Sequence, residues 1–287
     1  MDFVFADDAV QKNPTRPGMA GHELLALGGL YVPGEAVAGI EKTLEALCAD
    51  NGFPARGNPD GLSNEFKWSP GRECWMASGL VGAARESFFN GVLAILAEGE
   101  CQVYVVVSDT TFGTATNGAL TPSDDVLNLF LAERTEWVLK SHDTCGVVVA
   151  DRPSGGRTDE SRFLVGCLDT LEIGTEYVLP AHVAFNVVTT NSRFVRLLQA
   201  ADVVTSCTLA RVSGESVYSP SVFARVVPLM PKGYYDVYGG TGLKIHPSNH
   251  YANLYHWLLG DELIWRGGLG YRLPLPTQAY ATAQDVP

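Results

Sequence analysis

The chain has 287 residues, of which 46% are hydrophobic and 18% are charged, and its formal net charge is -12 at pH 7. This length and composition exclude a disordered chain and allow a sizeable buried core. The negative charge excludes a surface that coats nucleic acid through general positive charge, but not an enzyme that holds phosphates through bound metal and a few local cations.

The cysteines and the amino terminus indicate a compartment. The six cysteines are scattered and include no Cys-x-x-Cys pair, so we interpret them as buried, reduced thiols and not as a disulfide framework or a zinc site. The first residues are acidic at positions 2, 7 and 8, and no run of 18 apolar residues occurs. We therefore expect a cytoplasmic protein that does not span a membrane.

The first predicted element is a buried strand over residues 3–6, which ends at two carboxylates, Asp7 and Asp8. Such a run is typical of a strand in an α/β sheet that brings side chains to a site at its carboxyl end. Residues 24–32 (LLALGGLYV) predict a second strand, antiparallel to the first, with Asp7 at the rim. A solvated turn is the alternative interpretation of the two acids.

A helix and an extended segment come next. Apolar residues recur at helical spacing over residues 37–48, and Asn51-Gly52 supplies a stop signal. In an extended Glu65-Phe66-Lys67-Trp68, alternate side chains point to opposite faces. Glu65 and Lys67 would then share one face, and the two aromatic residues would share the buried one.

The middle of the chain alternates between helices and strands. Helices are predicted over residues 70–99, 122–141 and 160–172, the first two opened by the cap-then-proline pairs Ser69-Pro70 and Thr121-Pro122. Strands are predicted over residues 102–107, 146–150 and 183–188, and the first two run into Asp109 and Asp151. The basic loop 152–158 (RPSGGRT) carries Arg152 and Arg157, which could meet substrate phosphates.

A helix over residues 193–211, with Ser192 as its cap, carries an acid on its apolar face. Asp202 shares that face with Val195, Leu198 and Leu209 on a period of 3.6 residues. A buried carboxylate must be neutralised, paired or bound to metal, because its unpaired charge is costly.

The alternation of strands and helices fades after residue 212. A last helix is predicted at residues 250–259, and the Pro- and Ala-containing tail, 271–287, has a composition compatible with disorder. We therefore divide the chain into an α/β domain, 1–212, and a smaller C-terminal extension, 213–287, packed on it. The extension would cover the site or make a homodimer contact.

Four acids from separate predicted segments are candidates for one site: Asp7, Glu65, Asp151 and Asp202. Carboxylates gathered at one sheet edge suit hard cations such as Mg²⁺ or Mn²⁺. Two such ions about 4 Å apart can activate a water and stabilise the leaving oxygen of a phosphodiester. Lys67 would hold a phosphate or orient the water, with Asp8 and Asp109 as reserve candidates. Taken singly, each residue also has a structural interpretation, such as a turn or a surface ion pair.

These segments resemble a known family. Its motifs here are the opening strand with Asp7, LGGLYVP at 27–33, EFKW at 65–68, residues 147–151 and LLQAADVV at 197–204. Over residues 1 to 212 the chain looks like the family catalogued as domain of unknown function 3800 (DUF3800). The resemblance implies a ribonuclease H-like mixed sheet flanked by helices and a metal-dependent nuclease site in which Asp7, Glu65, Asp151 and Asp202 bind metal and Lys67 supports them. Members typically open with Asp-Glu-Ser-Gly, whereas this chain has Asp7-Asp8-Ala9-Val10.

Other interpretations are weaker. A phosphatase of the haloacid dehalogenase type needs a second Asp where this chain has Ala9. His246 and His250 have the spacing of a metal pair but are interrupted by Pro247 and lack further ligands nearby. We interpret Gly239-Gly240-Thr241-Gly242 as a turn, because the Lys-Ser/Thr of a phosphate loop is missing. The remaining alternative is a non-catalytic interaction protein of a defence or mobile-element system that retains the fold.

Overall fold

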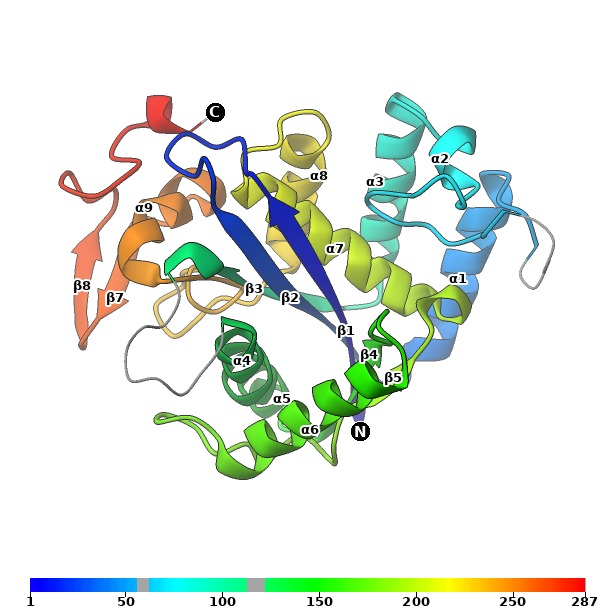
Figure 1. Cartoon of the computed structure of the whole chain (residues 1–287), viewed down its shortest axis with the longest axis horizontal. Coiled ribbons are helices and arrows are strands. Elements are labelled where there is room, and N and C mark those ends of the chain that lie inside the picture. The colour runs from blue at the N-terminus through cyan, green and yellow to red at the C-terminus, as the bar shows by residue number, and fades with distance from the viewer. Residues whose placement is uncertain (56–61, 113–121, 287) are drawn as a thin grey trace.

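The computed structural model describes residues 1–55, 62–112 and 122–286. It is a mixed α/β fold in which a six-stranded mixed sheet is flanked by helices, with a separate two-stranded hairpin near the C-terminus (Figure 1). The sheet has the order β5-β4-β1-β2-β3-β6. Its strands are β1 (Asp2–Lys12), β2 (Glu23–Val32), β3 (Gln102–Asp109), β4 (Gly146–Asp151), β5 (Val188–Thr190) and β6 (Leu243–His246), and the hairpin consists of β7 (Leu263–Arg266) and β8 (Leu269–Arg272).

Strand β1 lies inside the sheet, antiparallel to β2 and parallel to β4. The predicted antiparallel pairing of the first two strands is confirmed, and Asp7 lies opposite Gly28. The prediction that the first strand ends at Asp7 and Asp8 is wrong, because pairing with β2 continues to Lys12. The neighbouring strand β4 does end at this level: Ala150 pairs with Ala6, and Asp151 is the last residue of β4.

Helices cover both faces of the sheet. One core contains Phe5 of β1 together with α1 (Val37–Asp50), α3 (Ala83–Glu98), α7 (Arg196–Val212), α8 (Ser219–Val226) and α9 (Ser248–Leu259). The other contains Val4 and Ala6 with α4 (Pro122–Leu127), the π-helical η2 (Asn128–Thr135), α5 (Glu136–Ser141) and α6 (Arg157–Ile173). Since side chains alternate along a strand, Asp7 faces the α7 layer and Asp8 faces the α4–α6 layer.

Most predicted elements are confirmed with small shifts of their ends. The helix at 37–48 is α1, the strands at 102–107 and 146–150 are β3 and β4, and the helices at 160–172 and 250–259 are α6 and α9. The helix predicted over 122–141 is the unbroken run of α4, η2 and α5. Its proposed cap, Thr121, lies outside the described residues.

Two predicted elements and one predicted helix cap are wrong. Ser69-Pro70 opens a turn, and the chain forms the short α2 (Met76–Gly79) and then α3, separated by Gly82 at φ 57°. The strand at 183–188 shrinks to an isolated bridge at Val183 and to β5, which starts at Val188. The helix predicted over 193–211 is confirmed as α7, but it begins at Arg196, and its proposed cap, Ser192, lies in a 3-10 turn capped by Asn191.

The C-terminal region is joined to the rest of the fold. β6 pairs with β3, so residues 213–287 contribute a strand to the same sheet. The segment 271–286 is held against α9, where Asn253 Nδ2 donates to Leu275 O and Ala279 O at 2.9 Å each. Tyr280 is 6% exposed and donates from its hydroxyl to Pro17 O at 2.9 Å. The tail composition, compatible with disorder, therefore belongs to a packed segment up to residue 286.

Two further observations concern the cysteines and membranes. None of the six cysteines is in a disulfide, and five are buried, whereas Cys145 is exposed, against the expectation that all are buried. None of the helices in the described ranges combines the length and the apolar character required to span a bilayer.

Candidate active site: a carboxylate cluster on α7

The segment 62–68 is held along α7 by buried polar side chains. Three hydrogen bonds connect the two: Arg196 Nη1 donates to Asn64 O (2.7 Å), Phe66 N donates to Gln199 Oε1 (3.2 Å), and Trp68 N donates to Asp202 Oδ2 (2.8 Å). Every second residue of the extended segment thus meets a successive turn of the helix. This arrangement fixes which side chains of the segment face the end of β4.

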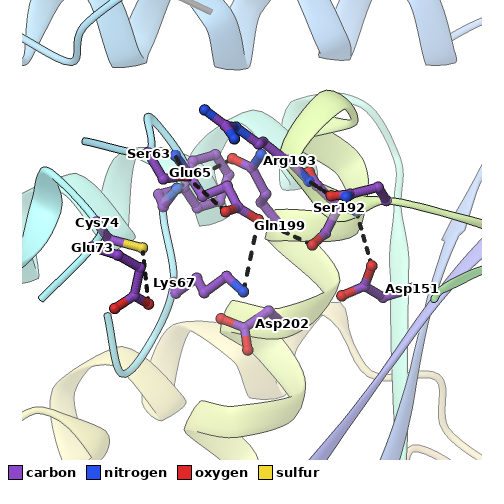
Figure 2. Close-up of polar contacts among 12 residues, drawn as sticks. Ser63, Glu65, Lys67, Glu73, Cys74, Asp151, Ser192, Arg193, Gln199 and Asp202 are labelled. Carbon is purple, nitrogen blue, oxygen red and sulfur yellow. Dashed lines mark hydrogen bonds and ion pairs between the residues drawn. The ribbon is translucent and has the colours of Figure 1, made fainter. Parts of the chain in front are cut away.

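The predicted alternation in the segment is confirmed. Phe66 is fully buried in the core, whereas the side chains of Glu65 and Lys67 retain 12% and 36% of their exposure. Lys67 Nζ lies 3.7 Å from Glu65 Oε1, and its chain extends toward Asp202 (Figure 2). Glu65 and Lys67 therefore lie in the same site and form a partly buried ion pair.

Ser192 connects two of the acids. Its hydroxyl donates to Glu65 Oε1 at 3.1 Å, and its backbone N–H donates to Asp151 Oδ1 at 2.9 Å (Figure 2). The sequence suggested only a helix cap for Ser192. Its position shortly after β5 is the available signal, because β5 pairs with β4 and the turn that follows lies beside Asp151 at the end of β4.

Asp202 projects from α7 toward Lys67 and is half-buried. Ser206 Oγ donates to its Oδ1 at 3.2 Å, in addition to the bond from Trp68 N. Burial raises the pKa of Asp202, and the charge of Asp151 raises it further; the two hydrogen bonds and Lys67 only partly oppose this shift.

Asp7 has the most perturbed carboxyl of the cluster. Burial, followed by the negative charges of Asp202, Asp8 and Asp151, holds its pKa well above the usual value of 3.8. Its one hydrogen bond among the described residues comes from the backbone N–H of Asp8 to Oδ1, at 2.8 Å. The strands and α7 therefore bring Asp7, Asp151 and Asp202 close enough to repel one another.

A glycine opposite Asp7 permits this close approach. A Cβ atom added to Gly28 would lie 1.9 Å from Thr205 Oγ1 of α7. The helix therefore packs directly against the backbone of β2 beside Asp7.

Lys67 is the counter-charge within the cluster. Burial alone would lower the pKa of Lys67, but attraction to Glu65, Asp202 and Asp151 outweighs it and raises the pKa. Three carboxylates thus attract the one ammonium group of Lys67, so negative charge exceeds positive charge among these residues.

The cluster suits a hard divalent cation in its chemistry but not as a preformed cage. Asp7, Asp151 and Asp202 offer carboxylate oxygens, the ligands that Mg²⁺ and Mn²⁺ prefer, and each already has one oxygen fixed by a backbone N–H. Burial raises the pKa of Asp7 most, and the negative charges of Asp202, Asp8 and Asp151 raise it further; a cation would compensate those charges. Across residues 1–55, 62–112 and 122–286, no three His, Cys, Asp or Glu side chains are grouped so that they could hold a metal ion.

The two reserve candidates have different surroundings. Asp8 borders the cluster: it lines a cavity of about 630 Å³ together with Asp7 and Asp151, and this cavity extends to Asp124 and Asp159 on the α4–α6 side of the sheet. Asp109 has other partners: its carboxylate pairs with His22 Nδ1 at 2.7 Å and accepts a hydrogen bond from the Tyr251 hydroxyl.

The two arginines after β4 lie at the surface. Arg152 Nε donates to Glu160 Oε1 at 3.1 Å, and 52% of its side chain is exposed. Arg157 is also exposed and forms the first residue of α6, so it is not in the loop where we expected it. The described residues show no contact between either guanidinium and the carboxylate cluster.

The weaker interpretations have simple structural outcomes. His250 is exposed and stacks on Phe112 at 4.2 Å, and neither it nor His246 belongs to a metal-ligand group of the described residues. Residues 239–242 form the predicted turn, which leads into β6.

Comparison with known proteins adds no relative: no protein-family model matches the chain, and no curated protein matches it. Functional reasoning therefore depends on the site itself.

Proposed function

We propose that the chain hydrolyses phosphodiester bonds of RNA or DNA with Mg²⁺ or Mn²⁺ held by Asp7, Asp151 and Asp202, with Glu65 beside them. The observation that carries the proposal is the meeting of three carboxylates from β1, β4 and α7, where burial and then the charges of the neighbouring acids raise the pKa of Asp7. The mixed sheet with helices on both faces and the sequence motifs of the DUF3800 family support a ribonuclease H-like arrangement.

The chain's own residues have separate tasks in this proposal. A bound cation would lower the pKa of a water and stabilise charge on the leaving oxygen. Lys67, whose ammonium is kept protonated by the acids around it, would hold a phosphate oxygen. Ser192 positions Glu65 and Asp151 through its two hydrogen bonds. Arg152 and Arg157, exposed beyond Asp151, would contact phosphates further along the strand.

The test is nuclease activity on a panel of single- and double-stranded RNA and DNA with Mn²⁺ or Mg²⁺. We expect cleavage by the wild-type chain, and we expect Asp151→Asn and Asp202→Asn each to reduce it by about 100-fold or more. The reason is that even outer partners of metal ligands typically cost about 10- to 100-fold when removed.

Asp143→Asn is the matched control. Asp143 is an exposed aspartate before the opposite end of β4, with φ 51°, a conformation that Asn also adopts. We expect it to keep full activity. A panel left intact by the wild-type chain, or equal cleavage by Asp151→Asn and Asp143→Asn, would contradict the proposal.

One observation favours the alternative of a non-catalytic interaction protein. Large apolar side chains are exposed on α6 and in the segment after it: Val165 (57%), Leu168 (41%), Ile173 (77%) and Leu179 (67%). Exposed apolar surface of this kind is common where proteins bind one another. An intact nucleic-acid panel together with self-association lost in Ile173→Lys would support this alternative, including a homodimer.

A further inference from the structure

A second cavity, of about 420 Å³, lies between the η2–α5 run and the C-terminal region. This volume falls within the range of about 300 to 1,000 Å³ usual for small-molecule sites. Its lining comes from η2 and α5, the connection at 233–241, β6, α9 and β7. Leu243 and Ile245 face the α7 core, so Lys244 between them faces the opposite side of the sheet, into this cavity.

Three cations line the cavity in a chain whose net charge is negative: Arg134, Lys244 and Arg266. The Lys244 ammonium makes no hydrogen bond or ion pair with any described residue, whereas its backbone belongs to the ladder between β6 and β3. Arg134 Nη2 donates to Glu133 Oε2 at 3.0 Å, and Arg266 Nη2 donates to Ser248 O at 3.0 Å. Glu133 is the one carboxylate that forms an ion pair with these cations within the described ranges, so positive charge is in excess.

The cations are close enough to disfavour one another. Burial lowers the pKa of Lys244, repulsion from Arg134 and Arg266 lowers it further, and Glu133 only partly opposes the shift. Arg134 Nε is buried without a hydrogen-bond partner among the described residues. An anion in the cavity would relieve both costs.

The remaining wall is aromatic. Tyr235 and Trp265 stack with ring centroids 3.5 Å apart and planes 15° apart, and Trp137 lines the same cavity. Trp265 Nε1 is buried without a partner in the described part of the chain, so it is a donor available to a ligand. Aromatic faces beside cations favour a planar ring that carries an anionic group.

The adjacent turn at residues 239–242 has no free backbone N–H that could bind an anion. Every backbone N–H of residues 239–242 is already donated: Gly239 to Asp261, Gly240 to Leu243 O, and Thr241 and Gly242 to Tyr238 O. Gly240 O instead accepts a hydrogen bond from Arg134 Nη1. Recognition would therefore come from the side chains of the three cations.

We propose that this cavity binds a nucleotide, with its phosphate at Lys244 and Arg266 and its base against the aromatic wall. The site is separate from the carboxylate cluster, and its occupancy requires no metal and no cleavage. Its failure would leave the nuclease proposal untouched, and the reverse also holds.

The test is calorimetric titration of the full chain, without divalent metal, using four probes: adenosine 5′-monophosphate, inorganic phosphate, adenosine and a 5′-phosphorylated tetranucleotide. We expect saturable binding of the monophosphate. The affinities for inorganic phosphate and for adenosine should be weaker by about tenfold or more, because phosphate lacks the base and adenosine lacks the phosphate. The tetranucleotide distinguishes the source: binding as tight as the monophosphate assigns the site to a strand end, and weaker binding assigns it to free nucleotides.

Lys244→Gln and Arg266→Gln should each weaken binding of the monophosphate by about tenfold or more, because each removes a charge-assisted contact. Lys42→Gln, on the exposed side of α1, is the matched control and should bind as the wild type does. Thermal unfolding of Lys244→Gln without ligand checks its fold, and we expect no loss of stability because a repelled cation is removed. No saturable binding of the monophosphate, or equal affinities in Lys244→Gln, Arg266→Gln and Lys42→Gln, would overturn the proposal. If inorganic phosphate binds as tightly as the monophosphate, the proposed contact between the base and the aromatic wall is wrong.

Discussion

Asp7 is a single residue whose ionised form destabilises the folded state. Its carboxyl has a folded-state pKa well above 3.8, first through burial and then through the charges of Asp202, Asp8 and Asp151. A raised carboxyl pKa means that the folded state binds the proton more tightly than the unfolded state does. The stabilisation of the fold by the protonated Asp7 carboxyl is therefore complete below pH 3.8. It is lost as the pH rises through the folded-state pKa of Asp7.

This sign predicts that Asp7→Asn stabilises the metal-free protein at pH 8. The melting temperature should rise by about 2 to 4 °C for each kcal/mol of repulsion removed. The gain should shrink as the pH falls, since Asp7 of the wild type then becomes protonated. Because Asp7 and Asp202 interact, the measured midpoint belongs to the cluster as a whole.

Thermal unfolding of wild type and Asp7→Asn from pH 4 to pH 8 in a chelator measures this difference. Adding Mg²⁺ should stabilise the wild type by mass action and stabilise Asp7→Asn less. A variant that is less stable than the wild type at pH 8 would show that the ionised Asp7 has a favourable partner.

At the scale of elements, the contact between α7 and β2 depends on Gly28. Its missing side chain leaves space for Thr205, whose Oγ1 is buried without a hydrogen-bond partner in the described residues. Gly28→Ala would place a methyl group 1.9 Å from that atom, so the helix would have to move away from the sheet. Overpacking of this kind typically costs about 1 to 3 kcal/mol.

We expect Gly28→Ala to lower the free energy of unfolding by about that amount, and Thr205→Ala alone to change it little, because Thr205→Ala removes an unsatisfied hydroxyl as well as packing. The double variant should be more stable than Gly28→Ala. Urea denaturation of the four chains gives the coupling energy directly. If the effects of the two substitutions on the free energy of unfolding are additive, the side chains at positions 28 and 205 are not in contact.

The elements that sequence reasoning predicted correctly are those whose pattern is local. The β-branched residues of β3 and β4 and the apolar period of α1 identify their structures without reference to the rest of the chain. The errors occur where distant contacts decide. Ser69-Pro70 looks like a helix start, but Gly82 breaks the helix before α3, and residues 183–187 lack a strand partner beyond one bridge.

The candidate site divides in the same way. Alternation placed Glu65 opposite Phe66, and helical periodicity placed Asp202 on the inner face of α7, so both acids could be anticipated. The parts that depend on tertiary contacts were missed: the bridge by Ser192, the pairing of Asp109 with His22, and the second cavity around Lys244. Each of these joins residues more than 40 positions apart, which no local pattern encodes.

At the scale of the whole molecule, the chain should unfold as one cooperative unit. β6, from the C-terminal region, pairs with the edge of β3, and its Leu243 and Ile245 are fully buried in the core on the α7 side. Helices α8 and α9 add Phe223 and Leu254 to the same core. The two regions therefore share a sheet and a hydrophobic core.

A chain that ends at residue 212 should consequently fail to fold or should aggregate, because it exposes the β3 edge and the apolar face that β6, α8 and α9 cover. The full chain should show a single calorimetric transition with equal calorimetric and van't Hoff enthalpies. Deletion of residues 281–287 is the control: no side chain of 281–286 is fully buried, and the cut spares Tyr280, so its transition should remain cooperative. A soluble 1–212 fragment that melts cooperatively near the temperature of the full chain would show that the C-terminal region is an independent addition, and β6 would then be only an accessory strand.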